Sequence, residues 1–215
     1  MIKLLKWARE ILRRVKHGTH ELCKLRRIRF YERISRIPTD MTMEEREFLY
    51  KSARDLASGS VIAEIGSYLG ASACFLASGG WGRISKLYCI DTWENDAMSE
   101  GQKKTFDAFL QNTSVFKDVI APLKGKSLEV VRLLDGPVDL LFIDGDHSYE
   151  AVVTDLKTYL PKVKAGGLLI MHDWGWAEGV RRAVRETVVP IQVDQPHILP
   201  NMYSVRIDPS KLSLA

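Results

Sequence analysis

VIAEIGSYLGASACFLAS, residues 61–78, joins a strand pattern to a helical pattern through a turn that contains two glycines. VIAEIG has the length and apolar content of a buried strand, and ASACFLAS reads as a short helix. The same order recurs: apolar runs at 86–91, 118–123, 138–144 and 166–173 precede helical patterns at 98–113, 127–134, 149–163 and 178–188. Two closing strands are expected in PIQVD (190–194) and NMYSVRID (201–208). The alternation predicts an α/β fold with a doubly wound, mostly parallel sheet of seven strands.

Basic residues are concentrated at the N-terminus. The chain has 215 residues and a formal net charge of +4, and residues 1–36 carry twelve Lys and Arg against three Glu. The remainder is therefore mildly acidic, which argues against a nucleic-acid surface spread over the domain, so we expect no nucleic-acid partner. We divide the chain into a basic helical extension, 1–38, and a main domain, 39–215.

Residues 3–17 have the pattern of an amphipathic helix. One face is apolar and the other carries Lys and Arg; the apolar residues are Leu4, Leu5, Ala8, Ile11, Leu12 and Val15. Such a helix can lie peripherally on an anionic membrane surface, pack on the main domain, cover the substrate pocket or form a dimer seam. We place packing or dimerisation ahead of membrane contact and expect a homo-oligomer.

The expected location of the protein is the cytoplasm, with peripheral contact at the inner membrane surface as an option. No run of 18 apolar residues occurs, and the charged start lacks the apolar centre of a secretory signal. Cys23, Cys74 and Cys89 form no CxxC pair and are expected to be free thiols.

A helix is expected to begin after Thr42, because Thr42 and Glu45 have the spacing of a capping box. It carries Phe48, Leu49 and Leu56 and is expected to end near Gly59.

Acidic residues follow the predicted strands. Glu64, Asp91, Asp144 and Asp173 each lie at or near the end of a separate strand. Ligands of open parallel sheets bind beyond the carboxyl ends of the strands, where these acids are expected to meet. This coincidence is the main functional signal in the sequence.

The glycine turn EIGSYLGAS (64–72) has the spacing GxxxG, with Gly66 and Gly70. It lacks the GxGxxG of dinucleotide sites and the Lys-Ser/Thr of a P-loop, so it favours a nucleoside-like ligand without a phosphate chain. Asp91, at the end of the next strand, can accept hydrogen bonds from both ribose hydroxyls. Alone, a GxxxG turn is more often a helix-packing turn; the acids on either side favour cofactor binding.

These motifs together resemble the class I S-adenosylmethionine-dependent methyltransferases. The resemblance is carried by ExGxxxGxS, a strand that ends in Asp91, FIDGDHSYE (142–150) and GGLLIMHD (166–173), in this order. Within the class the chain is most similar to the metal-assisted O-methyltransferases related to catechol O-methyltransferase, in a bacterial branch that acts on sugars and natural products. The resemblance covers roughly residues 40–208 and implies a Rossmann-like domain that binds S-adenosylmethionine.

The resemblance implies a cofactor site at the first two strand ends. Glu64, Gly66, Ser67 and Gly70 would surround the methionine portion, and Asp91 would hold the ribose. Ser127 would lie near the adenine with Trp93 close by, and Asp144 would border the cofactor.

The resemblance also implies a divalent cation, Mg²⁺ or Mn²⁺, at the ends of the fourth and fifth strands. Its ligands would be Asp144, Asp173 and His172. His172 departs from the acidic pair of the family, and imidazole suits transition metals better than Mg²⁺. His172 can therefore be a ligand of a softer ion, a group behind the ligands or a catalytic base, with Asp146 completing an otherwise short ligand set.

His147 stands where the family has a catalytic lysine, and an imidazole is a suitable general base near neutral pH. The structural alternative for the DGDH segment is an ordinary polar turn. Tyr149, Trp174 and Trp176 lie near this segment or the fifth strand end and can stack on a sugar or aromatic ring, or simply pack.

We therefore expect an enzyme that transfers a methyl group from S-adenosylmethionine to a hydroxyl of a sugar, glycan or natural-product small molecule. Metal assistance and a His general base are part of this expectation. The alternatives are metal-independent methylation, and a non-catalytic nucleoside-binding or membrane-tethered module of the same fold.

Overall fold

The computed structural model describes residues 30–94, 101 and 103–212. The chain divides into two compact units between Ile37 and Pro38. In the first unit, residues 30–35 are helical, and the Ser35 hydroxyl donates to the Tyr31 carbonyl at 2.7 Å. The helix expected at 3–17 lies outside the described residues.

The second unit is built on a seven-stranded sheet, as predicted. The strand order is β3-β2-β1-β4-β5-β7-β6; β7 pairs antiparallel with both β5 and β6, and the other neighbouring strands pair in parallel. The chain moves from β1 outward to β3 and then returns to β4 beside β1, so the strand order reverses between β1 and β4. The strands are β1 (Ser60–Ile65), β2 (Ile84–Asp91), β3 (Ile120–Lys124), β4 (Val138–Ile143), β5 (Val163–His172), β6 (His197–Leu199) and β7 (Met202–Ile207).

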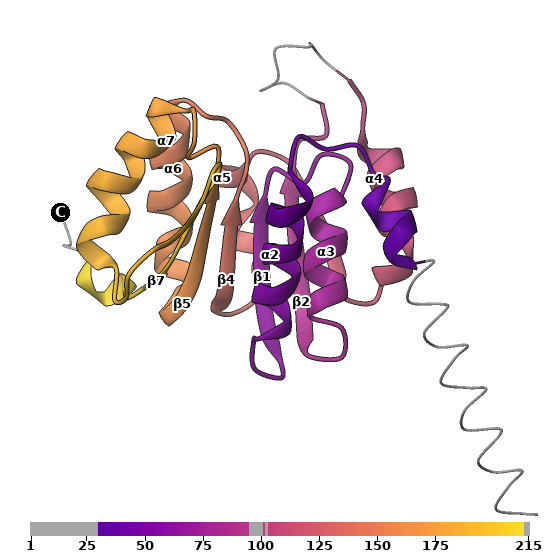
Figure 1. Cartoon of the computed structure of the whole chain (residues 1–215), viewed down its shortest axis with the longest axis horizontal. Helices are drawn as coiled ribbons and strands as arrows, with labels where there is room; N and C mark the ends of the chain where they lie inside the picture. Colours follow the sequence, from indigo (N-terminus) through magenta and orange to yellow (C-terminus); the bar gives the residue numbers. More distant parts are fainter. Residues whose placement is uncertain (1–29, 95–100, 102, 213–215) are drawn as a thin grey trace, which may run out of the picture. The chain divides into compact units, whose positions relative to one another are not determined.

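Helices cover both faces of the sheet, because right-handed crossovers that run in opposite directions from the reversal place their helices on opposite faces. α2 packs against α3 and α3 against α4, whereas α6 packs against both α5 and α7. In Figure 1, α2 and α3 stand in front of the strands. The helices are α2 (Met43–Arg54), α3 (Ala71–Gly79), α4 (Phe106–Thr113), α5 (Ser127–Val130), α6 (Tyr149–Tyr159) and α7 (Glu178–Ala183).

The capping box at the start of α2 is confirmed. The Thr42 hydroxyl accepts from the Glu45 backbone N–H at 3.3 Å, and the Glu45 carboxylate accepts from the Thr42 backbone N–H at 2.7 Å. The helix ends at Arg54, a few residues before the expected Gly59 turn.

Alternation along the strands separates an apolar layer from the layer that carries the site. Ile65, Ile143 and Met171 belong to the core beneath α6 and α7. Neighbouring residues in a strand point to opposite faces. Glu64 and His172 therefore point to the face that α2 and α3 cover.

Three sequence predictions of secondary structure are wrong in whole or in part. PIQVD is not a strand: residues 189–191 form a 3-10 turn, and Gln192 makes one isolated bridge to Ile207. Pro190 has no N–H to donate to a ladder, and β6 forms instead at His197–Leu199. Within the described part of 98–113, α4 begins only at Phe106, and the helix expected over 127–134 is α-helical only to Val130 before a 3-10 turn.

Cys74 and Cys89 are thiols, as predicted, and both are buried; Cys23 lies outside the described residues. In the part of the chain that the structure describes, no helix has both the length and the apolar character needed to cross a bilayer.

Candidate functional site

The turn after β1 is pressed against the end of β4. Gly66 has φ +86°, and a Cβ there would overlap the Asp144 carbonyl. The Asp144 backbone N–H donates to the Ile65 carbonyl at 2.8 Å. Only glycine has both the conformational freedom and the small size that this contact requires. The first glycine of the motif thus brings the β1 turn and the β4 acid together.

Glu64 is a buried acid with one unused oxygen. Its Oε2 accepts from the Ser67 hydroxyl at 2.6 Å, while Oε1 has no hydrogen-bond partner among the described residues. Burial raises the pKa of Glu64 to about 7, the hydrogen bond from Ser67 opposes that rise, and the nearby Asp144 charge adds to it. An unpaired buried carboxylate oxygen is costly without a ligand. This orphaned oxygen fits a cationic group of a cofactor.

Asp91 ends β2 and holds two backbone turns. Its carboxylate oxygens accept from the Tyr68 N–H at 2.7 Å and from the Trp93 N–H at 2.6 Å. A carboxylate oxygen has more than one lone pair, so both can still accept from a ligand hydroxyl. Trp93 is buried against Phe106 and Phe109, with ring centroids 4.7 and 4.8 Å away. The indole is therefore part of the core beneath this turn.

Three non-glycine residues among those described have a positive φ: Tyr68, Trp93 and Asp173. Each follows the carboxyl end of a strand: β1, β2 or β5. Such conformations cost on the order of 1–3 kcal/mol and cluster at functional sites. The three residues therefore lie at the same edge of the sheet as the acids that follow the strands.

Ser127, the predicted adenine-side residue, is engaged with α6. Its hydroxyl donates to Asp155 Oδ1, and its carbonyl accepts from the Tyr159 hydroxyl at 2.7 Å. Burial raises the pKa of Asp155 to about 6. The Ser127 hydroxyl thus fixes α5 against α6, and the start of α5 remains next to the β3 end.

Donor atoms converge at the ends of β4 and β5. One ligand atom from each of Asp144, His172 and Asp173 lies within 4.8 Å of the others. His172 Nδ1 is 2.9 Å from Asp144 Oδ1 and 3.3 Å from Asp173 Oδ1. Two carboxylates and one imidazole fit a divalent first-row transition ion better than Mg²⁺.

His147 lies on the other oxygen of Asp173. His147 Nδ1 and Asp173 Oδ2 are 2.9 Å apart, and the ring meets Trp176 edge-on with centroids 5.0 Å apart. The Trp176 indole N–H donates to Asp173 Oδ1 at 2.8 Å, yet 60% of Trp176 is exposed. An aromatic side chain held at one end and open at the other offers a stacking surface beside His147.

Charges in this cluster alter one another's pKa. Burial alone would lower the pKa of His172, but Asp144 and Asp173 raise it to about 11. Burial alone would raise the pKa of Asp173, but hydrogen bonds from His147 and His172 hold it well below its usual range. The Asp173 carboxylate raises the pKa of His147, and burial raises that of Asp144. The protonation of each group in this cluster therefore depends on the charges of the others.

The remaining predicted donor lies outside this cluster. Asp146 Oδ1 accepts from the Ser148 N–H at 2.7 Å and so closes the turn before α6. Among the described residues, the cluster of possible ligands comprises Asp144, His172 and Asp173 without Asp146.

Two site residues escaped the sequence analysis. Asn201, from the β6–β7 turn, donates from Nδ2 to Asp173 Oδ1 at 3.2 Å and accepts from the Gly175 N–H at 3.0 Å. Glu45 Oε1 lies 3.7 Å from His172 Nε2. The capping box identified Glu45 only as a helix residue, and no local signal marked Asn201.

Arg181 supports the loop that carries Trp176. Its guanidinium donates to the carbonyls of Trp174, Gly175 and Trp176 at 3.2, 3.0 and 3.3 Å. The exposed indole is thus held on a fixed backbone.

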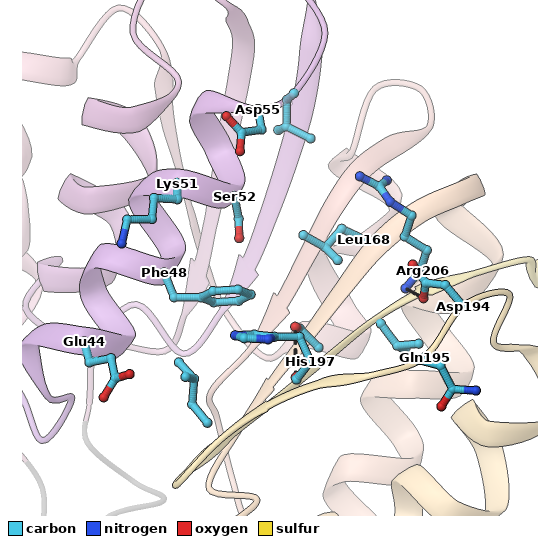
Figure 2. Close-up of a pocket in the computed structure, with 14 residues that line it drawn as sticks. Glu44, Phe48, Lys51, Ser52, Asp55, Leu168, Asp194, Gln195, His197 and Arg206 are labelled. Carbon is cyan, nitrogen blue, oxygen red and sulfur yellow. Dashed lines mark hydrogen bonds between the residues drawn. The ribbon is translucent and has the colours of Figure 1, made fainter.

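A groove of about 530 Å³ lies between α2 and the strands β5, β7 and β6. Figure 2 shows Phe48 and His197 lying against each other across it, with ring centroids 4.9 Å apart. Leu168 lines the groove, and His172, four residues further along β5, points to the same face. The groove therefore lies on the side of the sheet that carries the donor cluster.

Comparison with known proteins identifies the family of this chain. A family model described as "Methyltransferase domain" matches residues 63–174. An uncharacterized protein of Acanthamoeba polyphaga mimivirus is 28% identical over 137 residues, which are 60% of this chain and 59% of that protein. Protein y4gI of Sinorhizobium fredii is 27% identical over 52% of this chain and 13% of its own length. The chain thus spans only part of the curated relatives that it matches.

Solved structures agree on the architecture. An SAH-bound methyltransferase of Podospora anserina has a TM-score of 0.62 at 16% identity, covering 83% of this chain and 86% of that one. An O-methyltransferase of Bacillus cereus in complex with SAH has a TM-score of 0.59 at 17% identity, covering 80% and 85%. At such identities the likeness establishes the fold, and the predicted Rossmann-like methyltransferase architecture is confirmed.

Proposed function

Because the chain belongs to the methyltransferase domain family, we propose that it transfers a methyl group from S-adenosylmethionine to a hydroxyl oxygen of a sugar, glycan or natural-product small molecule. One observation carries the proposal: the donor cluster of Asp144, His172 and Asp173 adjoins the Gly66 turn, with His147 on Asp173. In this proposal the cofactor site, the base and the cation site would meet at one edge of the sheet.

The cofactor side is supported by Glu64 and Asp91. The unpaired Glu64 Oε1 suits the ammonium group of the methionine portion, and Asp91 suits the ribose hydroxyls. When bound, S-adenosylmethionine supplies an electrophilic methyl group on a positively charged sulfur. Gly66 and Gly70 both have a positive φ, and a Cβ at either would meet protein atoms, the Asp144 carbonyl at Gly66 and the Thr113 side chain at Gly70, so the turn keeps its shape only with glycine.

His147 is the proposed general base. Its Nδ1 donates to Asp173, which leaves the Nε2 lone pair for the proton of the acceptor hydroxyl. The deprotonated oxygen then forms the new C–O bond as the C–S bond breaks, which leaves a neutral thioether. Asp173 orients the ring and stabilises the imidazolium that forms, as the acid does in other carboxylate–histidine pairs. His172, with 4% of its side chain exposed, is far less accessible to an acceptor.

Asp144, Asp173 and His172 would hold the divalent ion. Bound there, such an ion would stabilise the alkoxide or phenolate of the acceptor. The mixed oxygen and nitrogen donors favour Mn²⁺ over Mg²⁺ in this proposal.

The acceptor is proposed to stack on Trp176 and extend toward the α2 groove. Trp176 offers an exposed ring beside His147, and the volume of the groove lies in the range of small-molecule sites. An aromatic surface suits the face of a sugar or a phenolic ring.

A panel of sugar, glycan and phenolic acceptors, incubated with S-adenosylmethionine labelled in the methyl group, tests the proposal. Label is expected in an acceptor as a methyl ether, with loss in chelator and recovery with Mn²⁺. S-adenosylhomocysteine binding without turnover on any acceptor, together with a harmless Asp144→Ala substitution in cells, would support a non-catalytic module instead.

Metal-independent methylation is the second candidate, favoured by the position of His172. Its ring lies between the two acids that would otherwise repel each other, so an imidazolium can hold them in place. Activity that survives exhaustive chelation would select this version.

A further inference from the structure

Glu45 is a buried acid that helix capping does not explain. Oε2 accepts from the Thr42 N–H at 2.7 Å and from the Thr42 hydroxyl at 2.8 Å. Oε1 has no hydrogen-bond partner in the part of the chain that the structure describes, and only 2% of the residue is exposed. A capping box needs one oxygen, which Gln supplies equally well. A buried charge with an unpaired oxygen is destabilising unless another partner offsets it.

The unpaired oxygen is aimed at His172. Glu45 Oε1 and His172 Nε2 are 3.7 Å apart, longer than a hydrogen bond but close enough for a small side-chain rotation to form one. The other ring nitrogen, Nδ1, approaches Asp144 and Asp173. The imidazole therefore lies between Glu45 on one side and the acid pair on the other.

The Asn201 side chain does not compete with Glu45 as an acceptor for the Nε2–H of His172. Its Nδ2 is 3.5 Å from His172 Nε2 but donates to Asp173 Oδ1 at 3.2 Å. An Nε2–H on His172 thus has Glu45 Oε1 as its nearby acceptor.

We propose that Glu45 is a positioning residue for the cation site: it accepts the Nε2–H of His172 and so leaves the Nδ1 lone pair for a divalent ion shared with Asp144 and Asp173. This inference rests on the proposed metal-assisted function. Carboxylates behind metal-binding histidines fix the ring, set which nitrogen carries the proton and raise ligand basicity. α2, from the start of the domain, thereby becomes part of the site.

The test is Mn²⁺ affinity, measured by calorimetry or electron paramagnetic resonance on the full chain saturated with S-adenosylhomocysteine. Glu45→Gln keeps size and cap but removes the charge, and it is expected to weaken Mn²⁺ binding about 10–100-fold. S-adenosylhomocysteine affinity is expected to stay unchanged. Glu47→Gln, an exposed acid of the same helix, is the matched control and should leave Mn²⁺ affinity within about twofold.

A double-variant cycle separates positioning from general damage. If Glu45 acts through His172, Glu45→Gln should have little further effect on Mn²⁺ affinity in a His172→Gln background. Glu45→Asp keeps the charge but moves it away from the His172 ring, so it should also weaken Mn²⁺ binding. This variant is used in place of Glu45→Gln if Glu45→Gln does not fold.

Two results would overturn the inference, and they are distinguishable. If the Glu45→Gln variant binds Mn²⁺ as tightly as the wild-type protein, Glu45 is not a positioning residue, and the proposed function is unaffected. No Mn²⁺ binding by the wild-type protein removes both this role and metal assistance.

Discussion

The turn after β1 and the ends of β4 and β5 adjoin each other, but they differ in how they are built. On the proposed cofactor side the shape is set mainly by the main chain, through Gly66, Gly70 and the positive φ of Tyr68 and Trp93. On the proposed cation side, polar side chains from three parts of the chain converge on Asp173 and His172: Asp144 and His147 after β4, Glu45 in α2 and Asn201 in the β6–β7 turn. A region shaped by its main chain, here called backbone-built, should lose stability when a substitution adds atoms. A region shaped by charged and polar side chains, here called charge-built, should accept added atoms more readily but lose function when a charge is removed.

The largest expected effect comes from an added atom on the backbone-built side. Gly66→Ala forces a Cβ into the Asp144 carbonyl at φ +86°, and we expect the free energy of unfolding to fall by about 2–6 kcal/mol, with loss of S-adenosylhomocysteine binding. Gly59→Ala is the matched control, since Gly59 has φ +83° but nothing within 4 Å of the added Cβ. In Gly59→Ala, backbone strain alone should lower the free energy of unfolding by about 1–2 kcal/mol. Equal losses in both variants, by chemical denaturation, would contradict the close contact.

The next effect is on chemistry. His147→Ala is expected to reduce kcat about 10²–10⁴-fold and to leave S-adenosylhomocysteine affinity unchanged. Because Asp173 raises the pKa of His147 above 6.5, the base is lost as pH falls through that raised value. In the wild type, kcat/KM should therefore rise with pH over a limb whose midpoint lies above 6.5. A flat profile, or full activity in the variant, would assign the proton to another group.

A smaller, pH-dependent effect belongs to Glu64. Its raised pKa, about 7, means that the free protein is most stable with Glu64 protonated and loses that stability as pH rises from about 4.5 through 7. A cofactor ammonium would reverse the preference, so S-adenosylhomocysteine affinity should increase about tenfold between pH 6 and pH 8. Glu64→Gln should remove this dependence. Calorimetry in buffers of different ionisation enthalpy would detect the proton release, and its absence would argue against an ammonium partner.

The backbone-built side could be predicted from the sequence more completely than the charge-built side. Gly66, Asp91 and the alternating strands are local signals, because a turn or a strand depends on residues close in sequence. Thr42 and Glu45 were predicted as a cap for the same reason, but the second oxygen of Glu45 points at a residue more than a hundred positions away. Asn201 reaches Asp173 only because β7 returns antiparallel beside β5. The β6 position was missed because pairing with β7, rather than its own three residues, makes it a strand.

The smallest expected effect tests whether the charge-built side also depends on a fixed backbone. Arg181→Lys loses the fork that reaches the carbonyls of Trp174, Gly175 and Trp176, while keeping the charge. Loss of one or two such hydrogen bonds is worth about 0.5–1.5 kcal/mol, so the acceptor KM should rise about two- to tenfold with kcat nearly unchanged. Arg185→Lys is the control, because Arg185 bonds to Glu178 on the exposed face of the same helical segment. A selective rise in KM would show that the stacking surface is positioned by main-chain contacts, as on the cofactor side. If both variants keep the wild-type KM, the Trp176 loop is held by Asn201 and Asp173 alone, and the contrast between the two sides stands in full.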